Sequence, residues 1–210
     1  RNAIILGAYR NAPSVACLAS HFILDSDREL REQYLAQVCA AQKVRERPLC
    51  FVASSYEQEM NRLAEIVRQR QIMNERVGII VPTNRLLHEI ATGLEKRGVM
   101  VEKAIKPDSK QMNRVKFDFG NTLPKIATFH MAKGLTFDSV LLPHLTEYCF
   151  PWTKGVARQR ILFVGIARAA QWVYMSTVKG REFSEMEILR KAEAEGHLTI
   201  QYRYDFESVG

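Results

Sequence analysis

The stretch "TFHMAKGLTFD" at residues 128–138 gathers side chains that can contact phosphate groups. The Lys133 ammonium offers positive charge, and the Thr128 hydroxyl and the His130 imidazole offer hydrogen bonds, which are groups that proteins direct at nucleic-acid phosphates. Gly134 follows directly, and because it has no Cβ its backbone can approach a ligand closely. The stretch raises a question, because a loop this polar runs directly into an apolar strand that ends at Pro143.

A second candidate is Arg168, which stands in the apolar run "ILFVGIARAA" at residues 161–170. An arginine presented to a phosphate chain stabilises the charge of a phosphoryl-transfer transition state and contributes on the order of 10³–10⁵ in rate. A solvated helix arginine is the alternative, but the apolar neighbours of Arg168 are unusual for an exposed helix. We therefore treat Arg168 as a candidate catalytic side chain.

The chain lacks the sequence signals of a nucleotide site of its own. A P-loop has the pattern G-x-x-x-x-G-K-[ST], and the 210 residues contain neither a Gly-Lys dipeptide nor a G-x-G-x-x-G pattern. The stretch "FILDSD" (22–27) has the form of an apolar strand ending in a Mg²⁺-binding aspartate. Its neighbours, however, have a helical pattern and no P-loop accompanies it. We expect that this chain does not hold a nucleoside triphosphate alone.

The cysteines and histidines do not have the spacing of a metal site or a disulfide framework. The cysteines are Cys17, Cys39, Cys50 and Cys149, and the histidines are His21, His88, His130, His144 and His197. No C-x-x-C pair occurs, so reduced thiols in the cytoplasm are the simpler expectation. The sequence predicts no metal ligands in this chain.

The composition is that of a globular domain with a basic surface. Hydrophobic residues make up 47% of the chain and charged residues 25%, the formal net charge is +7 and the pI is near 9.3. A basic domain can favour a polyanion because neutralised phosphates release counterions, but charge alone does not identify a partner. No apolar run approaches the roughly 20 residues that cross a bilayer, so we expect no membrane partner.

The elements that must position these side chains alternate between strands and helices. Five short runs are apolar almost throughout, which suits strands covered on both faces of a parallel sheet. The expected strands are 49–54, 77–82, 125–129, 138–143 and 171–177, and the expected helices are 12–23, 26–41, 55–71, 84–97, 156–170 and 182–194, with a loop over 104–124. This alternation predicts an α/β domain with a mostly parallel sheet flanked by helices.

Four segments, in order, resemble motifs of UvrD/Rep-like superfamily 1 DNA helicases. The stretches "TFHMAKGLTFDSVLLP" (128–143) and "RQRILFVGIARAAQWVYMST" (158–177) resemble motifs V and VI. Upstream, "LGAYRNAPSV" (6–15) is similar to the N-Y-R-S segment of the family, and "VGIIVPTNRLLHEIATGLEKRGV" (77–99) is similar to its strand–T-N–helix segment. The resemblance covers about residues 4–178.

The resemblance implies a RecA-like fold of the P-loop-NTPase type, in the role of the second motor domain, which lacks its own P-loop. We accordingly expect residues 1–210 to form a single C-terminal RecA-like domain, with 179–210 as a C-terminal extension. The chain would be a fragment of a longer protein, because the N-terminal RecA-like domain of this family carries the P-loop and the Mg²⁺ site. The implied cofactors are therefore ATP and Mg²⁺, both of which need that missing domain.

The resemblance also implies the residues that face the nucleotide. Arg168 and Arg10 match the two arginines that act as arginine fingers on ATP held across the cleft. Gly134 and Thr136 lie where relatives contact the nucleotide. Among the departures from the family pattern, Asn11 stands where Ser is usual and Thr136 stands where Glu is usual. A threonine has no carboxylate, which weakens the expected ribose contact.

A second implied set faces single-stranded DNA. Thr83 and Asn84 match a DNA-contacting Thr-Asn pair, and Thr128, His130 and Lys133 match positions that line the DNA track or link it to the ATP cleft. The two ligands explain why a polar loop precedes a buried strand at 138–143. We expect that strand to hold the loop rigid between DNA on one side and nucleotide on the other.

The sequence thus favours the C-terminal motor domain of an ATP-dependent superfamily 1 DNA helicase, inactive as an isolated fragment. One alternative is a non-catalytic nucleic-acid-binding or scaffold module that retains the helicase fold, which Thr136 and the absence of the usual acidic residues of motif VI favour slightly. Another is a free-standing α/β domain that uses Arg168 to bind an acidic metabolite. A P-loop and an acidic Mg²⁺ motif upstream of this chain would distinguish the motor from both.

Overall fold

A seven-stranded sheet forms the centre of the computed structural model, which describes residues 11–27, 29, 31–33, 35, 46–104, 117–151 and 153–202. The strands are β1 (Leu49–Ala53), β2 (Val77–Val81), β3 (Glu102–Lys103), β4 (Lys125–Thr128), β5 (Phe137–Leu142), β6 (Ala169–Val178) and β7 (Thr199–Gln201). Their order is β3-β4-β2-β5-β6-β1-β7, and every neighbouring pair is parallel. The expected α/β architecture is confirmed.

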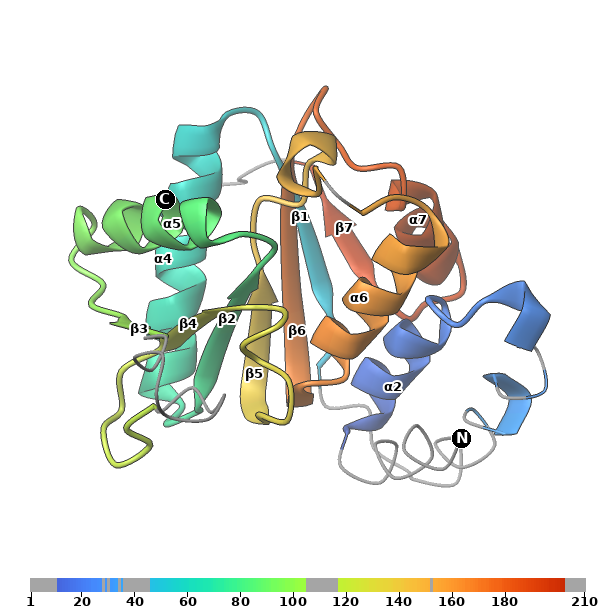
Figure 1. Ribbon diagram of the computed structural model, residues 1–210, viewed down its shortest axis with the longest axis horizontal. Helices are drawn as coiled ribbons and strands as arrows, with labels where there is room; N and C mark the ends of the chain where they lie inside the picture. The colour runs from blue at the N-terminus through green and yellow to red at the C-terminus, as the bar shows by residue number, and fades with distance from the viewer. Residues whose placement is uncertain are drawn as a thin grey trace, which may run out of the picture.

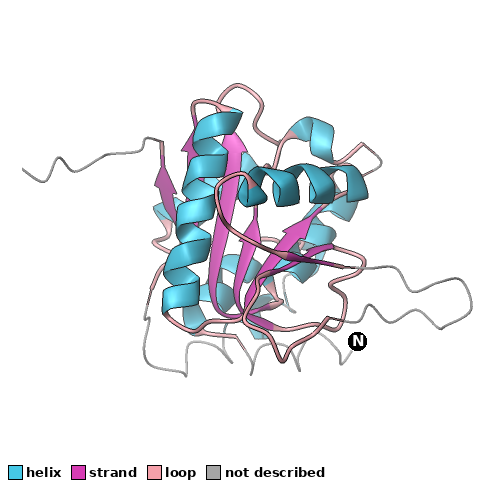
Figure 2. Ribbon diagram, turned by 90° about the vertical axis from the view of Figure 1, so that its left-hand side faces the viewer, coloured by secondary structure: helices cyan, strands magenta, loops and turns pink. Residues whose placement is uncertain are grey.

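Helices cover both faces of this sheet (Figure 1). The α-helices are α2 (Pro13–Ser20), α4 (Tyr56–Ile72), α5 (Asn84–Glu95), α6 (Val156–Ile166) and α7 (Met186–Ala194), and short 3-10 turns occupy Asp25–Asp27 and Glu147–Cys149. Helices α4 and α5 pack on one face, and α2, α6 and α7 pack on the other. The turned view in Figure 2 shows the strands enclosed between these helices.

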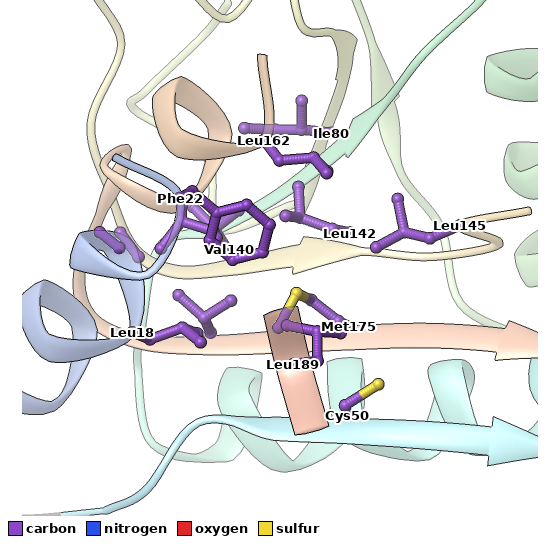
Figure 3. Close-up of a cluster of buried hydrophobic side chains, with 14 of the residues drawn as sticks. Leu18, Phe22, Cys50, Ile80, Val140, Leu142, Leu145, Leu162, Met175 and Leu189 are labelled. Carbon is purple, nitrogen blue, oxygen red and sulfur yellow. The ribbon is translucent and has the colours of Figure 1, made fainter. Parts of the chain in front are cut away.

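The apolar strand pattern follows from burial on both faces. Ile79 and Ile80 are neighbours in β2 and both are fully buried, because successive side chains of a strand point to opposite faces. Ile79 belongs to the core under α4 and α5, whereas Ile80 belongs to the core under α2, α6 and α7. In that second core, shown in Figure 3, Leu162 of α6 and Leu189 of α7 pack with strand residues such as Val140.

Side-chain caps define where α4 and α5 begin. The Ser55 hydroxyl accepts a hydrogen bond from the Gln58 backbone N–H at 3.2 Å and caps α4, as a serine at this position favours. Thr83 caps α5 in the same way through the Leu86 N–H at 3.2 Å. After α5, Gly98 has a φ of +73°, a conformation that glycine adopts without steric penalty.

The junction of α6 and β6 differs from the expected helix over 156–170. Helix α6 ends at Ile166, and Ala169 already pairs in β6 with Phe137 of β5. Because residues 161–170 are apolar on all sides, their pattern cannot separate a buried helix from a buried strand. Arg168 therefore lies in the turn between α6 and β6 rather than in a helix.

The N-terminal and C-terminal parts add further detail. The stretch 22–27 is a bend followed by a 3-10 turn, which agrees with the sequence-based argument against a Mg²⁺-binding strand there. The helix expected over 26–41 lies partly outside the described residues, and the described ones from 29 to 35 are helical. Within the extension at 179–210, α7 packs on the sheet and β7 adds a strand beside β1. No described helix is long and apolar enough to cross a membrane.

Candidate functional site

The starts of β5 and β6 bring Thr136 and Arg168 next to each other. The Phe137 N–H donates to the Arg168 carbonyl oxygen at 2.9 Å, and Phe137 is in register with Ala169. Each candidate residue immediately precedes its strand, so the two occupy the amino ends of neighbouring parallel strands. The Arg168 side chain is partly exposed, and its Nε donates to the Val164 carbonyl oxygen at 3.2 Å.

Asn11, just before α2, is hydrogen-bonded to this junction. Its Nδ2 donates to the carbonyl oxygens of Ala167 at 3.2 Å and Ala169 at 2.5 Å, which flank Arg168. The Ala12 N–H donates to the Ala170 carbonyl at 2.6 Å. An asparagine side chain can donate two hydrogen bonds, whereas the serine usual in relatives has one hydroxyl hydrogen. Arg10, the second expected arginine finger, lies outside the described residues.

The ends of β2 and β4 bring together the second set of candidates. Val81 of β2 is in register with Thr128 of β4, and the Phe129 N–H donates to the Val81 carbonyl at 3.1 Å. The residues that follow Val81 and Thr128 therefore meet at the carboxyl edge of the sheet. Asn84 and His130 are exposed there, so the structure brings them to one accessible edge.

The hydroxyl groups of Thr83 and Thr128 accept hydrogen bonds from nearby backbone N–H groups. The Thr83 hydroxyl accepts the capping bond from Leu86, and the buried Thr128 hydroxyl accepts a hydrogen bond from the Met131 N–H at 3.4 Å. A hydroxyl that accepts one hydrogen bond can still donate its own proton. Neither role excludes a ligand contact, but both fix the hydroxyl in place.

The segment 129–136 joins the two sets. It leaves β4 at the carboxyl edge and enters β5 at the amino edge, because all these strands are parallel. Successive turns carry the chain across, with the Ala132 N–H donating to Thr128 O at 2.9 Å. Gly134 is exposed with a φ of +84°, and an added Cβ would meet nothing within 4 Å. The backbone conformation, rather than crowding, favours glycine there. Lys133 beside it is exposed.

The two sets of candidates lie at opposite edges of the sheet. Ligands of parallel α/β sheets usually bind outside the carboxyl ends of the strands. Only the set around Asn84 and His130 lies at that edge. Thr136 and Arg168 lie at the opposite, amino edge.

A cavity of about 380 Å³ lies beside Ala12 and Gln171, but its chemistry does not suit phosphate. Its cation is Arg70, whose Nη2 lies 2.6 Å from Glu46 Oε1 and whose Nη1 lies 3.6 Å from Glu75 Oε1. The Arg70 guanidinium also stacks on Trp172 at 3.5 Å from the ring centroid. Because two carboxylates already balance this charge, we assign no phosphate contact to the cavity.

Sequence reasoning missed the buried role of Arg158, which lies inside α6 and is 1% exposed. Its Nε lies 2.8 Å from Glu185 Oε1 and its Nη2 lies 3.1 Å from Glu147 Oε1. The Arg158 hydrogen bond lowers the pKa of Glu147, which burial would otherwise raise. Ser184 completes this network, which joins α6 to the segment before α7. No local signal identifies such a network, because its partners lie 11 and 27 residues away.

A buried carboxylate on α4 was also missed. Glu59 is fully buried and accepts hydrogen bonds from the His144 N–H at 2.8 Å and from Ser176 Oγ at 2.7 Å. Its other oxygen lies 2.6 Å from His144 Nδ1. His144 has a φ of +57°, an uncommon conformation for a residue with a side chain. Glu59 therefore fixes the loop that follows β5.

The fold and the two edges define a RecA-like α/β domain that contains no P-loop. Residues 104–180 match the family profile of the UvrD-like helicase C-terminal domain. No curated protein matches the chain.

The solved structures agree with this fold. The C-terminal domain of a possible DNA helicase from Lactobacillus plantarum WCFS1 gives a TM-score of 0.64 at 12% identity, covering 91% of this chain and 97% of that one. At this identity the likeness shows a shared fold. The helicase domain of Hef from Pyrococcus furiosus gives a TM-score of 0.40 at 17% identity, over 80% of this chain and 32% of that one, which carries no argument.

Proposed function

We propose that this chain is the C-terminal motor domain of an ATP-dependent, UvrD/Rep-like superfamily 1 DNA helicase. The observation that carries the proposal is the segment 129–136, which runs from the edge with Asn84 and His130 to the edge with Thr136 and Arg168. A motor must couple a nucleotide site to a DNA site, and a short segment with one end in each is a direct mechanical link. ATP and Mg²⁺ would be held by an N-terminal RecA-like domain of the same protein.

On the nucleotide side, Arg168 and Arg10 would act as arginine fingers toward the phosphate chain held by that domain. Asn11, which follows Arg10 in the sequence, is bonded to the carbonyls on either side of Arg168, and this anchor supports a common role for the two arginines. Gly134 and Thr136 would contact the nucleotide. A guanidinium so placed stabilises transition-state charge without taking part in covalent chemistry.

On the other edge, Thr83, Asn84, Thr128, His130 and Lys133 would contact single-stranded DNA. Side-chain hydroxyl, amide and ammonium groups position a nucleic-acid backbone without reading its sequence. The domain alone would therefore bind single-stranded DNA weakly, and its affinity would fall as salt rises.

The test is the ATPase activity of the intact protein that carries this chain, with and without single-stranded DNA. Arg168→Ala should lower kcat by on the order of 10³ or more, and Arg168→Lys should recover only part of it, because the lysine ammonium lacks the planar fork of guanidinium donors. Arg190→Ala is the matched control, since Arg190 is an exposed arginine of α7. Hydrolysis by Arg168→Ala at the wild-type rate would remove the arginine-finger assignment.

A non-catalytic nucleic-acid-binding module is the second candidate, and Thr136 is the observation that favours it. Relatives with a glutamate at this place have a carboxylate for the ribose, which a threonine lacks. If the intact protein is a motor, Thr136→Glu should preserve or tighten ATP binding, measured as KM for ATP. If DNA binding persists while no ATP hydrolysis is detected in wild type or in Thr136→Glu, the module is the correct assignment.

A further inference from the structure

Three side chains of types that can bind metals lie close together where α2 and α7 end, although they come from distant parts of the sequence. His21 follows the last turn of α2, and Glu195 and His197 lie between α7 and β7. His21 Nε2 lies 2.9 Å from His197 Nδ1 and 3.5 Å from Glu195 Oε2. His197 Nδ1 lies 3.8 Å from the same Glu195 oxygen. The sequence predicts no metal site, because 176 positions separate the two histidines.

The triangle of donor atoms has the size of a zinc coordination shell. The point equidistant from His21 Nε2, His197 Nδ1 and Glu195 Oε2 lies about 2.0 Å from each of them, given their three separations. Zinc binds imidazole nitrogen at about 2.0–2.1 Å and carboxylate oxygen at about 2.0–2.2 Å. At this point an ion lies in the plane of the three donors. Tetrahedral zinc needs donors roughly 3.3 Å apart, so the two imidazoles, which are 2.9 Å apart, need to separate by a few tenths of an ångström to admit a fourth ligand.

The backbone holds the three ligands in place. The His21 N–H donates to the Leu18 carbonyl at 3.2 Å, and the His197 N–H donates to the Ala192 carbonyl at 2.8 Å. Between Glu195 and His197, Gly196 takes a φ of +77°, which closes the end of α7 as helix C-caps commonly do. This turn sets the carboxylate and the imidazole on the same side of the chain.

Burial and charge suit a cation that enters from solvent. The His21 side chain is 1% exposed, whereas those of His197 and Glu195 are 30% and 40% exposed. Arg31 and Lys191 bring positive charge near His21, and the Glu195 carboxylate offsets part of it.

We propose that His21, His197 and Glu195 bind one divalent transition-metal ion, with zinc as the best fit, and that a water completes its fourth position. Two imidazoles and a carboxylate are an established ligand set for zinc. The ion joins the turn after α2 to the turn that leads into β7, the edge strand beside β1. Zinc therefore stabilises the packing of the C-terminal segment on the domain.

The experiment measures Zn²⁺ binding to the 210-residue chain after treatment with a chelator, by isothermal titration calorimetry and by thermal unfolding. Wild type should bind one Zn²⁺ per chain, and its Tm should rise with added Zn²⁺, because an ion that binds only the folded state stabilises it. His197→Ala and Glu195→Gln should each bind at least about 10-fold more weakly, since even indirect partners of a metal contribute 10–100-fold. These two ligands are partly exposed, so their variants should fold.

Two variants serve as matched controls. His88→Ala removes an exposed histidine of α5, and Glu187→Gln removes an exposed carboxylate of α7. Both should bind Zn²⁺ as wild type does. The proposal is overturned if wild type shows no stoichiometric binding, or if the ligand variants bind Zn²⁺ as tightly as the controls. In that case the 2.9 Å contact is only a hydrogen bond between two imidazoles.

Discussion

A methyl group added at Gly165 tests how α6 packs on the segment that joins the two edges. Gly165 is buried in α6, and a Cβ there would overlap Cε1 of Phe129, lie 3.1 Å from Cδ1 of the same ring and lie 3.5 Å from Cδ2 of Leu142. Overpacking of this kind costs about 1–3 kcal/mol, whereas alanine gains roughly 1 kcal/mol over glycine inside a helix. We expect Gly165→Ala to lose about 1 kcal/mol of unfolding free energy.

Gly93→Ala is the matched control because it changes the same residue type inside α5. A Cβ at Gly93 would lie 2.7 Å from Cε of Met60, the end of a flexible side chain that can move aside. This variant should keep the helix-propensity gain and be about 1 kcal/mol more stable than wild type. The two variants should therefore differ by about 2 kcal/mol.

Thermal unfolding followed by circular dichroism measures the difference. For a domain of this size, 1 kcal/mol shifts Tm by about 2–4 °C, so Gly165→Ala should melt roughly 4–8 °C below Gly93→Ala. Trimming the ring in the double variant Gly165→Ala/Phe129→Leu should recover part of the loss, because it removes the overlapping atom. Equal Tm values for the two glycine variants would show that α6 does not press on Phe129.

Three further changes test other contacts. Asn11→Ala should lose about 1–3 kcal/mol, since two carbonyls at the α6–β6 junction lose their donor, and in the intact protein it should lower ATPase activity without abolishing DNA binding. Arg158→Ala should lose about 3–5 kcal/mol in urea unfolding by leaving Glu185 buried and unpaired, and the addition of Glu185→Gln should recover part of this loss. Burial acts to raise the pKa of Asp138, but hydrogen bonds from Arg76 outweigh it and hold that pKa below 3.8. The ionised pair therefore stabilises the fold above pH 3.8 and loses this contribution as the pH falls further, so Asp138→Asn should flatten the decline of Tm in that acid range.

Much of the fold was predictable because its strands are buried on both faces. An uninterrupted apolar run such as residues 77–81 has few other interpretations when Thr83 and a helical pattern follow it. The same burial hid the end of α6. Where nearly every residue is apolar, the sequence shows neither the helical nor the strand periodicity that would mark the boundary. The sequence also could not reveal β7, which is three residues long and has exposed Thr199 and Gln201 on either side of Ile200.

The candidate site was also predictable only in part from the sequence. Gly134 was selected from its type and its place in the sequence, and the structure gives it a φ of +84°, but its contact with a nucleotide stays a prediction. Contacts between distant segments were not predictable, because nothing in the pattern at Arg158 distinguishes a solvated helix arginine from one paired with Glu185. The donors of His21 and His197 meet through the sheet order, which brings the first and last described elements to the same side of the molecule.

The position of Arg168 at the amino edge has a mechanical consequence for the proposed motor. A domain that holds its own nucleotide uses the carboxyl ends of its strands, so an arginine at the opposite end suits a phosphate chain presented by a neighbouring domain. β5 is held between β2 and β6, so a movement of its start in the proposed motor would act on the segment 129–136 that precedes it. Eight residues along, that segment begins beside His130 at the opposite, exposed edge, which makes it the shortest covalent route between the two edges for such a movement.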